Sequence, residues 1–228
     1  MAFGFFKKKN SGKNEVNNTA NQSHISPGHF NATKEDVERL AKEAGHIISM
    51  FEHVYADKNE RIKYVSALAG YACHQAVVAN GEPLVKVETT DGLEYYLGDS
   101  VNYYLLEGPF SVLVFLQGCY EYKTGSRNKL DIIPVVQNAI KNIGNDAYKI
   151  WGEDTPDLLY LRTKECWNGI YQNMTGVYCK NPSEWPVLYG IVLQNIILKA
   201  DVDVKESFYK ALECVLFISK MDDKSIRK

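Results

Sequence analysis

The sequence predicts a mainly α-helical protein, a single domain of about seven to eight helices around one central helix, with one β-hairpin. Three observations support this class. Apolar residues recur at three- and four-residue steps through most of residues 33–221, which is the period of amphipathic helices. The stretch 61–80 carries small residues around most of the helix and no charge after Lys63. Residues 84–97 place β-prone runs on either side of an Asp-Gly pair, a strong hairpin signal.

Residues 1–32 are expected to form a disordered tail, because they are rich in Asn and lack a periodic apolar pattern. Within the tail, residues 1–9 combine three phenylalanines with three lysines. Such a segment can touch an anionic membrane surface weakly, at roughly 1 kcal/mol per lysine. Peripheral membrane contact through residues 1–9 is therefore one interpretation of this segment. We assign residues 33–228 to the helical domain.

The first two helices have clear start signals. Thr33, followed by acidic residues, predicts a helix from Thr33 to about Tyr55. Asp57 and Glu60 match a capping box that begins the central helix, and Asn80-Gly81 ends it. A central position is expected because its small residues allow close approach of neighbouring helices on several sides. They are Ser66, Ala67, Ala69, Gly70, Ala72, Cys73 and Ala76.

The hairpin at about 84–97 is followed by further helices. Two isolated strands are only marginally stable in water, so the hairpin must lie against the helices or pair with another chain. Turn and cap residues delimit the later helices, and we expect the last residues of the chain to be frayed. The expected helices span 101–107, 110–122, 131–143, 155–178, 183–200 and 203–221.

Charge and cysteine usage limit the function classes. The formal net charge is −2, and the tail contributes +3, which leaves −5 on residues 33–228. An acidic body with one short basic loop at 123–129 disfavours nucleic-acid binding. No apolar run reaches the roughly 20 residues that span a bilayer. The five cysteines are scattered without a CxxC pair, so we expect a cytoplasmic protein with reduced thiols.

Histidine is the residue best suited to proton transfer near neutral pH, and His74 lies within the central helix. Together with Tyr71, one turn earlier, and His46 from the first helix, it forms our candidate catalytic or ligand-binding site. The opposing interpretation is a core histidine with satisfied hydrogen bonds. His46 and His53 are two turns apart, too far for both to bind one metal ion. We predict no metal and no cofactor, because no GxSxG, HExxH, Walker A or GxGxxG motif occurs.

Tyrosine is abundant, with fifteen in the chain, and four lie within ten residues. Tyr95 and Tyr96 must point to opposite faces of a strand, so one of them is expected to reach solvent or a partner. Tyr103 and Tyr104 flank the apolar face of the next helix. Tyrosine is favoured at protein interfaces, so these four are the candidate partner-binding residues. The alternative is that they are ordinary half-buried core tyrosines.

These observations favour a cytoplasmic protein-interaction module without enzymatic activity. It would bind a protein partner or a second copy of itself through an acidic, tyrosine-bearing surface. An adaptor, a chaperone-like protein and a toxin-neutralising protein all fit this description. The alternative is a helical enzyme or small-molecule binder whose pocket lies between helices and uses His74 and Tyr71.

Overall fold

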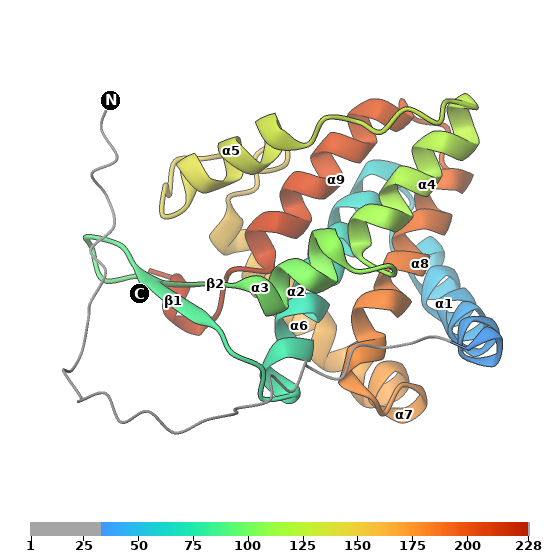
Figure 1. Cartoon of the computed structure of the whole chain (residues 1–228), viewed down its shortest axis with the longest axis horizontal. Helices are drawn as coiled ribbons and strands as arrows, with labels where there is room; N and C mark the ends of the chain where they lie inside the picture. Colours follow the sequence, from blue (N-terminus) through green and yellow to red (C-terminus); the bar gives the residue numbers. More distant parts are fainter. Residues whose placement is uncertain (1–32, 228) are drawn as a thin grey trace, which may run out of the picture.

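The computed structural model describes residues 33–227 and confirms a mainly α-helical fold with one β-hairpin (Figure 1). Seven helices of ten or more residues occur in this part of the chain. They are α1 (Lys34–Val54), α2 (Lys58–Ala79), α4 (Val112–Thr124), α5 (Ile133–Asn142), α6 (Pro156–Ile170), α8 (Trp185–Lys199) and α9 (Val204–Ile218). The short helices are α3 (Asp99–Asn102) and α7 (Gly176–Tyr178). The predicted tail, including residues 1–9, lies outside the described residues.

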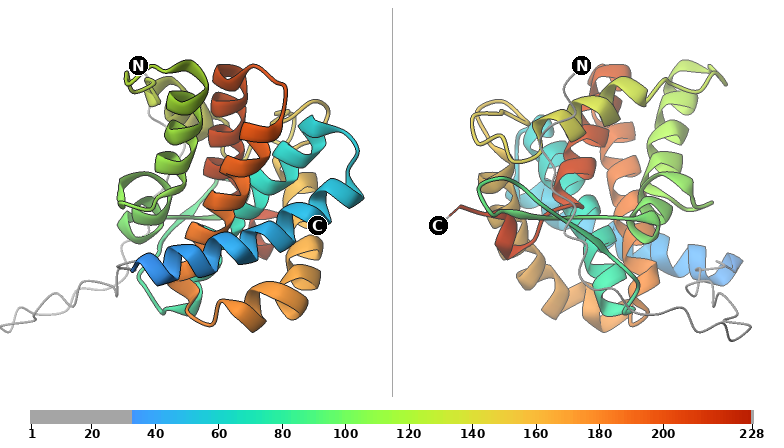
Figure 2. Two further views of the ribbon diagram at one scale, coloured as in Figure 1. Left: turned by 90° about the vertical axis from the view of Figure 1, so that its right-hand side faces the viewer. Right: turned by 60° about the vertical axis from the view of Figure 1, so that its left-hand side comes forward.

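The central helix is α2, as predicted. It packs mainly against α8 and α9, while α1 and α4 cover α8 from outside and α6 lies on a further side of α2 (Figure 2). The small residues between Ser66 and Ala76 are all buried, which is why the helix has no polar face. Gly70 marks the closest approach: a Cβ placed there would lie 2.5 Å from the Val215 carbonyl oxygen of α9. Backbone therefore packs directly against backbone at the core.

The helix starts follow the predicted caps. Thr33 forms a capping box with Asp36, in which each side chain accepts a hydrogen bond from the other residue's backbone. Asp57 accepts hydrogen bonds from the backbone amides of Asn59 and Glu60, at 2.8 and 2.9 Å. The reciprocal half of the predicted box is absent, because the Glu60 carboxylate accepts from Lys63 instead, at 2.7 Å. Ion pairing outcompetes the capping contact here.

The hairpin consists of β1 (Val85–Glu88) and β2 (Glu94–Leu97), with the turn around Gly92 at φ +85°. The strands are antiparallel, with Val85 opposite Leu97 and Glu88 opposite Glu94. In Figure 1 the hairpin lies on the outside of the helical body. Its β2 strand contacts the C-terminal turn η4 (Asp223–Ser225), so the hairpin is supported from one side.

Two predicted helices change character before they end. The predicted helix 101–107 begins two residues earlier, as α3, and continues as a π-helical turn, η1 (Tyr103–Glu107). The segment 155–178 likewise contains a second π-helical turn, η2 (Tyr171–Thr175). The helix expected from residue 183 begins at Trp185 instead, because Ser183 belongs to the 3₁₀ turn η3 (Pro182–Glu184), which Asn181 caps.

The expectation that the last residues are frayed is wrong. Ser225 is fully buried, and its hydroxyl donates a hydrogen bond to the Glu94 carbonyl of β2. Arg227 forms ion pairs with Asp91 in the hairpin turn and with Asp146 in the loop after α5. The charged composition suggested solvation, but the charges are paired across the chain. The C-terminal segment is therefore part of the folded body.

Among the described residues, no helix is long and apolar enough to cross a bilayer. The buried apolar side chains of residues 33–227 form one continuous core, which α2, α8 and α9 dominate.

Candidate functional site: the β-hairpin and its C-terminal support

The hairpin has one covered edge and one uncovered edge. On the β2 side, the Tyr96 amide donates a hydrogen bond to the Lys220 carbonyl, at 2.9 Å. The Ser225 hydroxyl covers the same strand two residues earlier, at Glu94. On the β1 side, the described residues contain no further strand, because the sheet consists of β1 and β2 alone. The β1 side chains are exposed except for Val87, which is half-buried.

The hydrogen-bond pattern shows which backbone groups of β1 face outward. In an antiparallel pair, residues alternate between pairs that bond to each other and pairs whose polar groups point away. The Tyr96 amide points away from β1, so the Lys86 and Tyr96 pair belongs to the second kind. The amide of Thr89 bonds to the Leu93 carbonyl across the turn, so this pair is of the bonded kind. Counting back along β1, the alternation again makes Glu88 and Lys86 residues of the outward-pointing kind. The amides and carbonyls of Lys86 and Glu88 therefore point outward from the free edge.

Of the two glutamates on this face of the hairpin, one forms two ion pairs and the other forms none with the described residues. Glu94 accepts ion pairs from Lys86 at 2.7 Å and from Lys224 at 3.2 Å. The Lys86 hydrogen bond, followed by that of Lys224, lowers the pKa of Glu94 to about 2. Glu88 lies directly opposite Glu94, is exposed, and forms no ion pair with another described residue. The hairpin thus places two glutamates opposite each other, and only Glu94 of the two has an ion pair.

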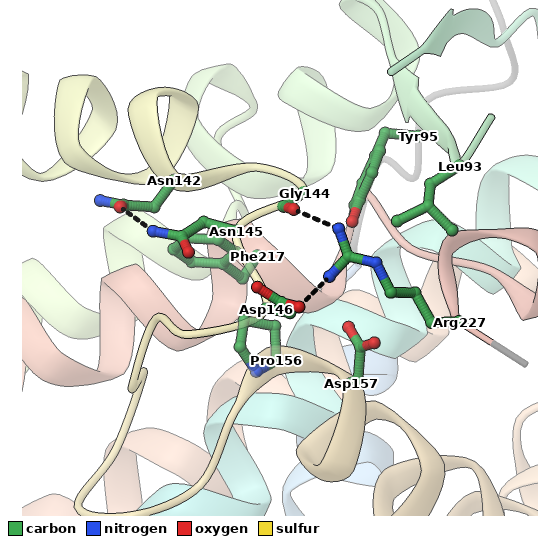
Figure 3. Close-up of a pocket in the computed structure, with 10 residues that line it drawn as sticks. All are labelled: Leu93, Tyr95, Asn142, Gly144, Asn145, Asp146, Pro156, Asp157, Phe217 and Arg227. Carbon is green, nitrogen blue, oxygen red and sulfur yellow. Dashed lines mark hydrogen bonds and ion pairs between the residues drawn. The ribbon is translucent and has the colours of Figure 1, made fainter. Parts of the chain in front are cut away.

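Figure 3 shows how the other face of the hairpin is fastened. Arg227 bridges the carbonyl of Gly144, at 3.1 Å, and the carboxylate of Asp146, at 2.8 Å. Tyr95 and Leu93 line the same hollow, and Asp157 faces it with a pKa raised by burial. The hollow holds no more than about one water molecule. It serves as a clamp between the hairpin and the α5–α6 loop, with too little room for a substrate.

The four predicted interface tyrosines divide into buried and partly exposed residues. Tyr95 is 3 % exposed and packs into the clamp, while Tyr96 on the opposite face is half-buried. Tyr104 is 4 % exposed, and its hydroxyl donates to Glu82 at 2.8 Å. The half-buried Tyr103 lies edge-on to Tyr104, with ring centroids 5.6 Å apart. Tyr103 and Tyr104 belong to η1, so the four tyrosines lie in two different surroundings.

The histidine candidates are not brought together with Tyr71. His74 is 3 % exposed, and its Nδ1 lies 3.1 Å from the Ser219 carbonyl oxygen, while burial lowers its pKa. The ring of Tyr96 lies edge-on to His74, at 5.5 Å between centroids. Tyr71 packs instead against Tyr160 and Trp167, and the exposed His46 on α1 pairs with Glu43. Residues 33–227 contain no group of three or more His, Cys, Asp or Glu side chains placed to hold a metal ion.

A larger cavity, of about 260 Å³, lies where the α1–α2 turn meets the end of α8. None of the three histidine and tyrosine candidates lines it. Charged side chains dominate the lining: the Lys58 ammonium donates to the Asp201 carbonyl oxygen, and the Lys199 ammonium donates to Glu52. The lining residues are Glu52, Lys58, Arg61, Ile196, Lys199, Ala200 and Asp201.

The structure buries two lysines whose burial was not predicted from the sequence. Lys63, 4 % exposed, pairs with Asp154 at 2.6 Å and with Glu60 at 2.7 Å. A lysine at the start of a long uncharged helix was the available signal for such a buried pair. Lys220 is 6 % exposed beside the hairpin, and its charged neighbours in the sequence concealed its burial.

Comparisons of the chain with protein-family models, with curated proteins and with solved structures found no match.

Proposed function

We propose that this protein is an interaction module that binds an extended protein segment along the free edge of β1. The segment belongs to a partner protein or to a second copy of the chain. The observation that carries this proposal is the asymmetry of the hairpin. The β2 strand is tied to the body, whereas Lys86 and Glu88 are exposed residues whose outward amides and carbonyls bond to no other segment of residues 33–227. Strand addition at such an edge supplies main-chain hydrogen bonds to the added segment.

The proposed surface differs from the one expected from the sequence. Tyr95 and Tyr104 are core residues, so their large side chains are not offered to a partner. Tyr96 supports the hairpin from the face that also carries Lys86 and Glu88. The binding surface therefore centres on β1, with Tyr96 as its neighbour on β2. An adaptor, a chaperone-like protein or a toxin-neutralising protein would use this edge in the same manner.

We place this function in the cytoplasm and with protein ligands. All five cysteines are free thiols, and burial raises the pKa values of all five, as suits a reducing compartment. The body at −5 repels nucleic-acid phosphates.

The edge can be blocked without breaking the hairpin. Glu88→Pro removes an amide that points outward, whereas Val87→Pro removes one that bonds within the hairpin. We expect Glu88→Pro to abolish both self-association and capture of a partner while the circular dichroism spectrum is unchanged. Tyr122→Ala, at an exposed side chain on α4, is the control and should retain binding. Binding that survives Glu88→Pro, or no binding by the unmodified protein, would overturn the proposal.

A further inference from the structure

We propose that β1 pairs with β1 of a second copy, in one register centred on Val87, to give a four-stranded sheet across a two-fold axis. This inference rests on the proposed function, because it names the occupant of the free edge. An antiparallel pairing of identical strands suits a closed dimer, since the same patch is used on both copies.

The phase of the hydrogen bonds restricts the registers. A backbone group that points outward can bond only to an outward group of the added strand. Lys86 and Glu88 point outward, so either can face its own equivalent or the other residue in the second copy. When Val87 faces Val87, Lys86 faces Glu88 of the second copy, and the reverse pair forms by symmetry. Four backbone hydrogen bonds then join the two copies.

The charges select among these registers. Centring the pair on Lys86 would place two lysines opposite each other, and centring it on Glu88 would place two glutamates opposite each other. Like charges directly opposite destabilise a sheet, whereas opposite charges stabilise it. Only the register centred on Val87 pairs Lys86 with Glu88 twice. Charged residues on an edge strand often prevent strand pairing. Here the lysine and the glutamate of one copy face the glutamate and the lysine of the other, so the charges attract.

Glu88 provides a further reason for this register. Within one copy it faces Glu94 and forms no ion pair with a described residue. Lys86 and Lys224 both form their ion pairs with Glu94, and Lys86 acts on Glu88 of the same copy only through a longer-range attraction. In the proposed dimer, Lys86 of the second copy lies opposite Glu88. The exposed β1 side chains leave the edge open to an incoming strand.

The test is sedimentation equilibrium on the full chain and on two single variants, Lys86→Glu and Glu88→Lys. A four-residue edge is short, so we expect a dissociation constant on the order of 100 µM for the unmodified protein. Each variant makes both cross-strand pairs repulsive and should raise this constant about tenfold or more. Mixing the two variants restores both attractive pairs, so the mixture should form a heterodimer as tightly as the unmodified protein.

Glu88→Lys controls for damage to the hairpin, because Lys86→Glu also removes the ion pair between Lys86 and Glu94. Glu88→Lys places a cation opposite Glu94 and should strengthen the hairpin even as it weakens the dimer. A mixture that stays monomeric, or single variants that associate as well as the unmodified chain, would overturn the register. If the unmodified protein is monomeric throughout but captures a partner that Glu88→Pro loses, this inference fails and the proposed function stands. If the unmodified protein neither self-associates nor captures a partner, both proposals are overturned.

Discussion

Lys220 follows α9 and is buried next to the hairpin, with 6 % of its surface exposed. Its carbonyl receives the Tyr96 amide, but no hydrogen bond or ion pair to its ammonium occurs within residues 33–227. Burial lowers its pKa to about 8. The charged form is therefore more costly in the folded chain than in the unfolded chain, and this cost is present at neutral pH.

Replacing Lys220 with methionine should stabilise the protein. The shift from the usual lysine value to about 8 corresponds to about 3 kcal/mol at pH 7. Between pH 8 and 10, the unfolded chain keeps the proton that the folded chain has lost, so the unmodified protein becomes more stable as pH rises. We expect the advantage of Lys220→Met to shrink by about 1 kcal/mol between pH 7 and pH 9. Urea unfolding at the two pH values measures this, and an advantage that grows with pH would contradict the assignment.

At the scale of elements, the decisive contact is that between α2 and α9. The buried small residues of α2 let the two helices approach until Gly70 faces the backbone of Val215. Close-packed interiors yield little to an added methyl group, especially where the neighbour is backbone. The same helix also positions His74 under Tyr96, so the core contact and the hairpin support are parts of one arrangement.

Gly70→Ala tests this contact. The added Cβ must displace the Val215 carbonyl, so we expect a loss of about 2 to 3 kcal/mol in the free energy of unfolding, measured by chemical denaturation. Gly45→Ala is the matched control, because Gly45 lies exposed on α1 and a Cβ there meets nothing within 4 Å. The control should gain about 0.5 to 1 kcal/mol from helix propensity. Equal effects of the two substitutions would show that the close approach is absent.

The local signals for these elements were readable in the sequence. Thr33 and Asp57 cap the helices that they were predicted to start, and Thr155 and Asp203 cap the helices expected over 155–178 and 203–221, because a cap depends on residues within one turn. The hairpin was also predicted, since the Asp-Gly turn is a local signal. The π-helical turns η1 and η2 were missed, because they depend on how the next segment packs.

At the scale of the whole molecule, the features that could not be predicted from the sequence are contacts between residues far apart in the chain. Arg227 pairs with Asp91, 136 positions away, and no local pattern indicates that contact. Strand alternation showed that Tyr95 and Tyr96 face opposite ways, but the identity of the buried one depends on the clamp of Figure 3. The open edge of β1 also depends on a long-range contact, because the C-terminal segment covers β2 and leaves β1 uncovered.

The central claim is that Lys86 and Glu88 offer free backbone groups that pair on association. Amide hydrogen exchange, followed by NMR at several protein concentrations, tests it residue by residue. In dilute protein, we predict rapid exchange at Lys86 and Glu88 and slower exchange at Val85 and Val87, which bond within the hairpin. At concentrations that favour the dimer, Lys86 and Glu88 should become protected. Protection of these two amides in the dilute monomer, or rapid exchange at every concentration and with any captured partner, would contradict the account.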